Sequence, residues 1–148
     1  MYMPTLLTTL ALAASTLAES TIVKNHCDFP VWVTQVTSQG QGATVQIAAS
    51  SGKWSEPQAG AGVAIKITTT ADGLYTAAPV LHLSYSSSAS SIYYDLNSIY
   101  GYSFSGKTLR LHGSEAAAPE VVWSEEPIAP PNTKAYIGQT NLVLELCE

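Results

Sequence analysis

The chain has 148 residues, of which 46% are hydrophobic and only 11% are charged, and its formal net charge is −5. Its six basic residues stand singly along the sequence, which excludes a polybasic surface for nucleic acid or for an anionic membrane. A chain of this length suits one domain and can bury a core without help from a metal ion.

The first residues have the pattern of a secretion signal. A short apolar stretch from Leu6 to Ala14 is followed by Thr16-Leu17-Ala18, which offers small residues at the positions that a signal peptidase reads. The stretch is too short to span a bilayer, and no later segment is apolar for long enough. We therefore predict a signal peptide over residues 1–18, a mature domain over residues 19–148, and a secreted protein of the extracellular space or cell wall.

Two cysteines, Cys27 and Cys147, lie near the two ends of the mature chain. In a secreted chain with two thiols, the simplest outcome is one disulfide between them. The bond would close a loop of roughly 120 residues and add about 4–5 kcal/mol of stability in the chain-entropy model, less if the ends are strained. We expect it to fasten the first β-segment to the last.

Apolar and polar residues alternate through most of the mature chain, which favours strands over helices. In chain order, strands are predicted over residues 21–24, 29–37, 43–49, 63–69, 80–85, 92–96, 108–111, 120–123 and 142–147. No segment after the signal has the apolar period of a helix, and turn-forming residues recur at short intervals. These features indicate an all-β domain, either an antiparallel β-sandwich or a flattened barrel.

The segments between these strands also carry expectations. The glycine-rich residues 38–42 should form the turn of a hairpin, after which Ala43, Val45 and Ile47 should face inward. A Gly/Ser/Pro-rich loop is expected around Trp54, the serine run 84–91 is expected to be a flexible loop, and residues 115–132 are expected to form a long surface excursion.

Three segments carry a resemblance across nearly the whole mature chain. They read TIVKNHCDFPVWV from Thr21, GKWSEPQAGAGVAIKI from Gly52 and IYYDLNSIYGYSFSG from Ile92. The terminal LELC is also similar in position to the terminal cysteine region of the sequences that these segments resemble. Together they resemble the small fungal branch of the thaumatin-like family, named for the Blastomyces yeast-phase-specific protein or antigenic thaumatin-like protein. The resemblance implies a thaumatin-like antiparallel β-sandwich. We expect this sandwich to lack the large disulfide-rich lobe of larger relatives, because two cysteines cannot supply that lobe's bridges.

For function, the resemblance implies secretion and antigenicity more firmly than any biochemical activity. We expect a non-enzymatic protein that binds a cell-wall polysaccharide such as β-glucan, or that acts as an antigen or effector on a host protein. We expect a monomer with no cofactor and no nucleic-acid or membrane partner.

Exposed aromatic rings are the candidate ligand contacts, because the apolar faces of sugar rings pack on them. Trp54 is expected to be exposed in its loop, and Asp95 is expected to serve a turn at a strand end. The alternative is that the tyrosines are half core and half rim of the sandwich. The candidate ligand-binding residues are Trp54, Tyr93, Tyr94, Tyr100 and Tyr102, with Glu56 and Asp95 as hydrogen-bond acceptors.

The alternative function is weak hydrolysis of β-1,3-glucan in an acidic cleft, which the resemblance to larger relatives implies. Hydrolysis needs two carboxyl groups about 5–10 Å apart. Where those relatives carry acidic residues, this sequence has His82 and Ser84 on one strand and Tyr100-Gly101 after another, so only Asp95 is kept. We therefore expect no catalytic residue. We also expect no metal site, because the spacing of His26, Asp28 and the distant histidines matches no ligand motif.

Overall fold

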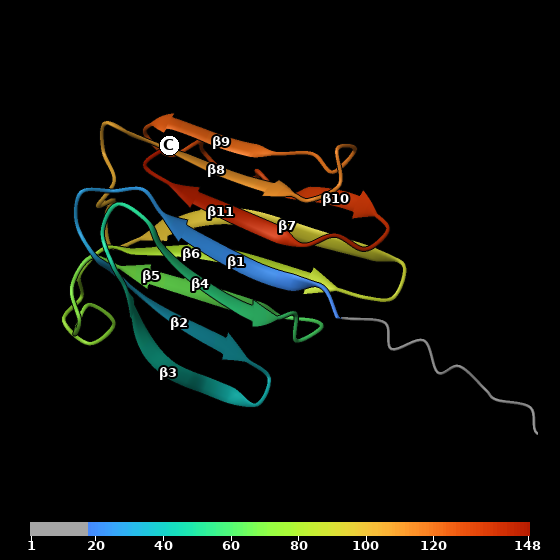
Figure 1. The fold of residues 1–148 in the computed structure, drawn as a ribbon, viewed down its shortest axis with the longest axis horizontal. Helices are drawn as coiled ribbons and strands as arrows, with labels where there is room; N and C mark the ends of the chain where they lie inside the picture. Colours follow the sequence, from blue (N-terminus) through green and yellow to red (C-terminus); the bar gives the residue numbers. More distant parts are fainter. Residues whose placement is uncertain (1–17) are drawn as a thin grey trace, which may run out of the picture.

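Two β-sheets packed face to face make up the computed structural model, which describes residues 18–148 (Figure 1). The predicted signal peptide lies outside the described residues except for Ala18. Among residues 18–148 there is no helix, so none is long and apolar enough to cross a membrane. The expected all-β sandwich is confirmed, and the barrel alternative is not, because the sheets stay open.

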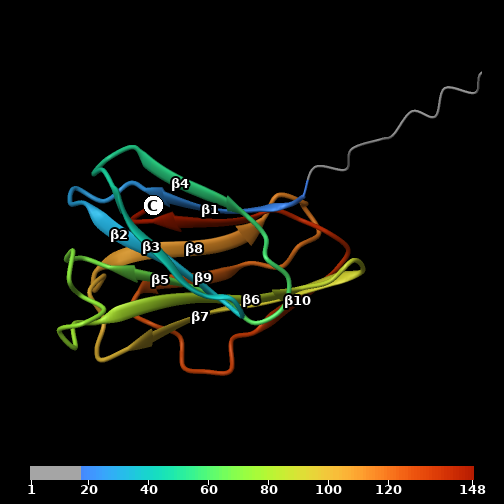
Figure 2. The ribbon, with the colours of Figure 1, turned by 90° about the horizontal axis from the view of Figure 1, so that it is seen from below.

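The five-stranded sheet has its strands in the order β4, β1, β11, β8, β9. Their bounds are β4 (Gly52–Pro57), β1 (Ser20–Asn25), β11 (Leu142–Leu146), β8 (Lys107–Gly113) and β9 (Val121–Glu125). The six-stranded sheet has the order β10, β7, β6, β5, β2, β3. Their bounds are β10 (Lys134–Ile137), β7 (Ser91–Ile99), β6 (Val80–Ser87), β5 (Val63–Thr68), β2 (Val31–Thr37) and β3 (Gly40–Ile47). Figure 2 shows the sheets as two layers, with β4 and β1 in one and β5, β6 and β7 in the other.

The first and last strands lie side by side at the centre of the five-stranded sheet. β1 and β11 pair in parallel, with Val23 opposite Leu144, whereas the other pairs among the described strands are antiparallel. The predicted disulfide between Cys27 and Cys147 closes this pair, with a Cα–Cα distance of 4.9 Å across 120 residues of sequence. Such a bond is compatible with an extracellular protein.

The core lies between the two sheets and is aliphatic with a few large rings. β5 and β6 supply Ile65, Ile67 and Leu83, and these side chains are fully buried. On both strands the intervening residues, such as Lys66 and His82, point to the opposite face. The alternation that predicted the strands therefore also separates the core face of the six-stranded sheet from its outer face.

Several details differ from the sequence-based expectations. The segment around Trp54 is strand β4 rather than a loop, and β10 was not predicted. In β3 only Ile47 is buried, whereas Ala43 and Val45 are exposed, because this strand lies at the edge of its sheet. The hairpin that β3 forms with β2 is confirmed, but its turn is shorter than the expected residues 38–42, because Gly40 already pairs with Thr37.

The serine run is more ordered than expected. Its first residues complete β6, and Ser91 begins β7. Ser86 Oγ accepts a hydrogen bond from the Gly62 amide at 2.9 Å, and Ser88 Oγ accepts from the amides of Ser90 and Ser91. The hydroxyls thus satisfy backbone groups of the turns, which is a structural role.

Candidate functional site

The large rings expected to bind a ligand lie in different environments. Trp54 is only 7% exposed, because on β4 it points inward while its neighbours Lys53 and Ser55 point outward. Tyr94 is 1% exposed, and its hydroxyl donates a hydrogen bond to the Pro119 carbonyl. Burial raises the pKa of the Tyr94 hydroxyl. The prediction that Trp54 is an exposed ring is therefore wrong, and neither side chain offers a free face.

Tyr102 is partly buried and packs against the core. Its ring contacts Trp123 edge to face, with centroids 5.7 Å apart, and lies 6.1 Å from the ring of Phe104. Burial, and to a smaller extent the charge of Glu126, raises the pKa of Tyr102 to about 12. The Tyr102 hydroxyl is buried and has no hydrogen-bond partner among the described residues. Tyr102 therefore packs the core, as the alternative interpretation expected for part of the cluster.

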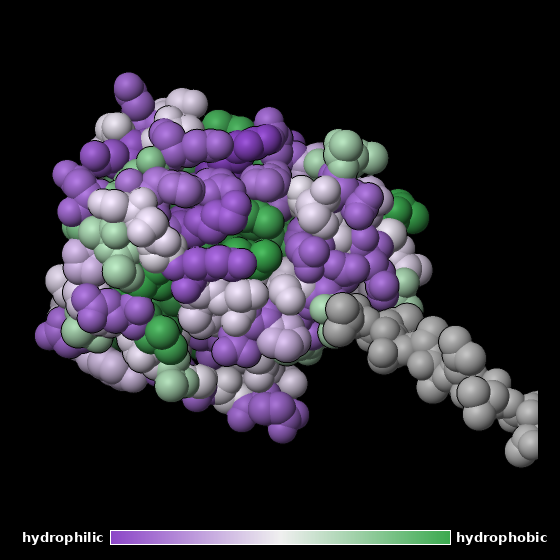
Figure 3. All heavy atoms as spheres, viewed as in Figure 1, coloured by the Kyte–Doolittle hydropathy of each residue, from purple (hydrophilic) through white to green (hydrophobic). Residues whose placement is uncertain are grey.

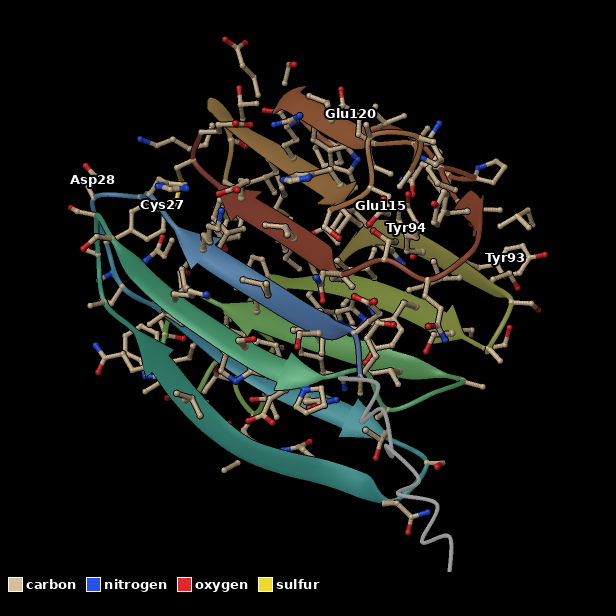
Figure 4. The ribbon with its side chains drawn as sticks, turned by 45° about the vertical axis from the view of Figure 1, so that its right-hand side comes forward. Cys27, Asp28, Tyr93, Tyr94, Glu115 and Glu120 are labelled. Carbon is tan, nitrogen blue, oxygen red and sulfur yellow. A yellow bond between two sulfur atoms is a disulfide. The ribbon has the colours of Figure 1, made fainter. Side chains whose placement is uncertain are left out.

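Tyr93 and Tyr100 are the exposed members of the set, at 50% and 71%. They stand near opposite ends of β7, and at the rise of an extended strand this places them about 23 Å apart. Tyr100 has a positive φ of 59° in the turn after β7, followed by Gly101 at 110°. Figure 4 shows Tyr93 pointing away from the body of the molecule while Tyr94 lies within it. One continuous aromatic platform is therefore not formed.

A shallow groove of about 330 Å³ lies beside Tyr93 on the outer face of the six-stranded sheet. Neighbouring strands align its residues: Ala64 stands opposite Ser84, which stands opposite Asp95, and Ser86 stands opposite Tyr93. Directly opposite residues of antiparallel strands share a face, so these side chains project together. We call the set Ala64, Ser84, Ser86, Tyr93, Asp95 and Thr133 the β6–β7 groove.

Asp95 lines the β6–β7 groove from strand β7. Its expected place at a strand end is wrong, because β7 continues to Ile99. The Asp95 carboxylate accepts a hydrogen bond from Thr133 Oγ1 at 3.2 Å. Asp95 is the only carboxylate among the residues that line the groove. The groove can therefore accept hydrogen bonds from ligand hydroxyls, but its lining lacks the second carboxyl group that glycoside hydrolysis requires.

The row next to the groove carries His82 between Lys66 and Asn97. Burial lowers the pKa of His82, the Lys66 charge lowers it further, and the Asp95 charge acts in the opposite direction. His82 and Ser84 thus share the outer face with Asp95, at the positions where the sequence lacks the acidic residues of larger relatives. β6 adds no carboxylate to this face.

Glu56 and Trp54 belong to β4, in the other sheet, so they do not join the β6–β7 groove. The structure instead adds Ser84, Ser86 and Thr133, which the sequence analysis did not select. The alternation of β6 could have identified the two serines as outward-facing. Thr133 stands directly after the surface excursion, two residues beyond Pro131. No pattern in the sequence indicates that it reaches Asp95.

The histidines considered as metal ligands meet a carboxylate on the outer face of the five-stranded sheet. His26 Nε2 lies 2.6 Å from Glu145 Oε2, and His112 Nε2 lies 3.6 Å from Glu145 Oε1. The Lys24 ammonium donates to the same Oε1 at 2.8 Å, so a cation of the protein already neutralises this carboxylate. Within the described part of the chain, no group of three or more His, Cys, Asp or Glu residues could hold a metal ion.

This outer face is mainly hydrophilic, with small apolar areas between charged side chains (Figure 3). Arg110 donates to Glu120 at 2.7 Å and also contacts Glu148. Lys107 lies 3.8 Å from Asp28 near the disulfide. Exposed ion pairs of this kind contribute little stability.

Comparison with known proteins identifies the family of the chain. The family model described as the Blastomyces yeast-phase-specific protein matches residues 7–148. No curated protein matches the chain in sequence.

Two solved structures share the fold. The protein elicitor MoHrip2 from Magnaporthe oryzae has a TM-score of 0.75 and 23% identity, covering 88% of this chain and 100% of that one. The thaumatin-like xylanase inhibitor TLXI has a TM-score of 0.62 and 17% identity, covering 86% of this chain and 99% of that one. At these identities the likeness concerns the fold.

Proposed function

The chain belongs to the Blastomyces yeast-phase-specific protein family, and on this premise we propose that it is a secreted, non-enzymatic protein that binds a cell-wall polysaccharide such as β-glucan. The β6–β7 groove is the proposed binding surface. The observation that carries the proposal is the half-exposed ring of Tyr93 beside two serine hydroxyls and the single carboxylate of Asp95.

Each part of the groove fits one chemical feature of a sugar chain. The free face of Tyr93 offers apolar area for the C–H face of a pyranose ring. Asp95 and Ser84, side by side on neighbouring strands, can accept hydrogen bonds from vicinal hydroxyls. Because the groove lies on the surface of the sheet, a polymer can enter it along its length rather than by one end.

Binding without hydrolysis follows from the same lining. A glycosidase needs one carboxyl group as an acid and a second as a base or nucleophile on the other side of the scissile bond. Asp95 has no such partner in the groove. The alternative, weak β-1,3-glucan hydrolysis, requires reducing ends to appear from laminarin and to disappear with Asp95→Asn.

The direct experiment is retention of the purified mature protein on insoluble polysaccharides. We expect the protein to sediment with β-glucan and to be released by soluble laminarin, which presents the same sugar. Absence of retention on β-glucan, chitin and other wall polysaccharides would contradict the proposed function.

A second candidate is an effector or antigen that binds a host protein. Ile128 and Ile137 are exposed large apolar side chains, and Ile137 is 78% exposed. An exposed aliphatic side chain offers an apolar contact that a protein partner could cover. Loss of a captured host protein with Ile137→Ser, with polysaccharide retention unchanged, would separate this candidate from the first.

A further inference from the structure

Strand β3 forms one free edge of the six-stranded sheet, and it lacks charge. Its sequence, Gly40–Ile47, contains no charged residue and no proline. An edge strand exposes unpaired backbone N–H and C=O groups, which another strand can pair with. Natural proteins usually protect such edges with charges, prolines, bulges or very short strands.

The other three edges of the described sheets carry these protections. β4 includes Lys53, Glu56 and Pro57. β9 has five residues and ends at Glu125, and β10 has four residues and begins with Lys134. β3 is longer than each of them, with eight residues.

β3 has one of these protections, a β-bulge, which affects only the first half of the strand. The register between β2 and β3 shifts between Thr34 and Val36, where β3 contains one residue more than β2. This bulge disturbs the ladder around Gly42. From Thr44 to Ile47 the pairing with β2 is regular, so this half presents an undisturbed edge.

Val45 is the exposed apolar residue of the regular half. It stands opposite Val33, which is fully buried, so its side chain points to the core face of the sheet. Val45 is nevertheless 43% exposed. The reason is that the five-stranded sheet ends at β4 and leaves β3 at the margin of the sandwich (Figure 1).

We propose that two copies of this chain associate through β3, in antiparallel pairing with Val45 at the two-fold axis. Each Val45 then covers the other, and Thr44 of each copy faces Gln46 of the other. An antiparallel pair of identical strands is self-complementary, as a two-fold interface requires. The occupant is a second copy because two chains of net charge −5 can meet at an uncharged edge without placing like charges together.

This proposal differs from the monomer expected from the sequence, which does not show which strand lies at a free edge. The association also extends the six-stranded sheet across the axis, so the β6–β7 grooves of both copies open on the same face. The inference does not depend on the proposed ligand, and its test uses the protein alone.

The experiment is sedimentation velocity of the mature protein from micromolar to millimolar concentration. Four samples accompany the wild type: Val45→Lys, Val45→Glu, an equal mixture of these two, and Ile137→Lys at the other edge of the same sheet as a matched control. Circular dichroism of each variant establishes that it is folded, which we expect because Val45 and Ile137 are both exposed.

We expect the wild type and Ile137→Lys to approach twice the monomer mass at the highest concentrations. Val45→Lys and Val45→Glu should each stay monomeric, because like charges then meet at the axis. Their mixture should recover the dimer, since Lys then faces Glu. A wild type that stays monomeric throughout, a Val45 variant that associates as the wild type does, or a mixture that stays monomeric would overturn the proposal.

Discussion

At the scale of single residues, the environment of a ring decides its role more than its type does. Trp54 and Tyr93 both looked like sugar contacts in the sequence, yet one packs the core and the other stands half-exposed beside a groove. The difference arises from the face of the strand that each residue occupies. A sequence shows alternation but does not show which side of an edge strand the second sheet covers.

Trp54→Ala should therefore act on stability. Removing a buried tryptophan side chain leaves a cavity and should cost about 3–5 kcal/mol. Tyr93→Ala, at an exposed site, should change stability by roughly 0.5 kcal/mol or less. Urea unfolding followed by tryptophan fluorescence and circular dichroism measures both. A Trp54→Ala protein as stable as the wild type would show that Trp54 does not belong to the core.

Glu145 links stability to pH at the same scale. Burial would raise the pKa of its carboxyl group, but hydrogen bonds and attraction from Lys24 and His26 outweigh burial, so the pKa is lowered on folding. A carboxylate with a lowered pKa stabilises the fold above its unfolded pKa of about 4.3, and this contribution is lost as pH falls through the folded value.

Glu145→Gln should thus lower the free energy of unfolding by roughly 1–3 kcal/mol at neutral pH, with the lower end favoured because Lys24 and His26 are partly exposed. The difference from the wild type should shrink below about pH 4, where the wild-type carboxylate is protonated too. Urea titrations at several pH values measure this. A difference that grows as pH falls would contradict the assignment.

At the scale of elements, the sequence predicted most strands because alternation is strong where one face is buried. β5 shows this, since Val63, Ile65 and Ile67 are buried as the pattern indicates. β4 was missed because Gly52 and Pro57 at its ends read as loop residues. β10 was missed because four residues give too little pattern. The parallel pairing of β1 with β11 was also not predicted, since register is a long-range property.

The disulfide is the element-scale feature with the largest predicted effect. Cys27→Ser together with Cys147→Ser releases the ends of the paired first and last strands. The chain-entropy model predicts a loss of about 4–5 kcal/mol. Urea unfolding of the double variant measures the loss, and addition of reductant to the wild type provides the matched control. Equal stability of the oxidised and reduced forms would contradict the role given to this bond.

At the scale of the whole molecule, the sandwich could be predicted from alternation and from the family resemblance together. The candidate site could be predicted only in part: Tyr93 and Asp95 were selected, whereas Ser84, Ser86 and Thr133 were not. The groove depends on which strands are neighbours in the six-stranded sheet, and on Thr133 reaching Asp95 from a distant segment. Neither property is local in the sequence.

The central claim is that the outer face beside β7 binds a polysaccharide, and two tyrosines of that strand region test it most directly. Tyr93→Ala removes the ring at the groove, and Tyr100→Ala removes a more exposed ring at the far end. Affinity for insoluble β-glucan should fall about tenfold with Tyr93→Ala and stay unchanged with Tyr100→Ala. Equal affinities of the wild type and Tyr93→Ala, or an equal loss in both variants, would contradict the claim.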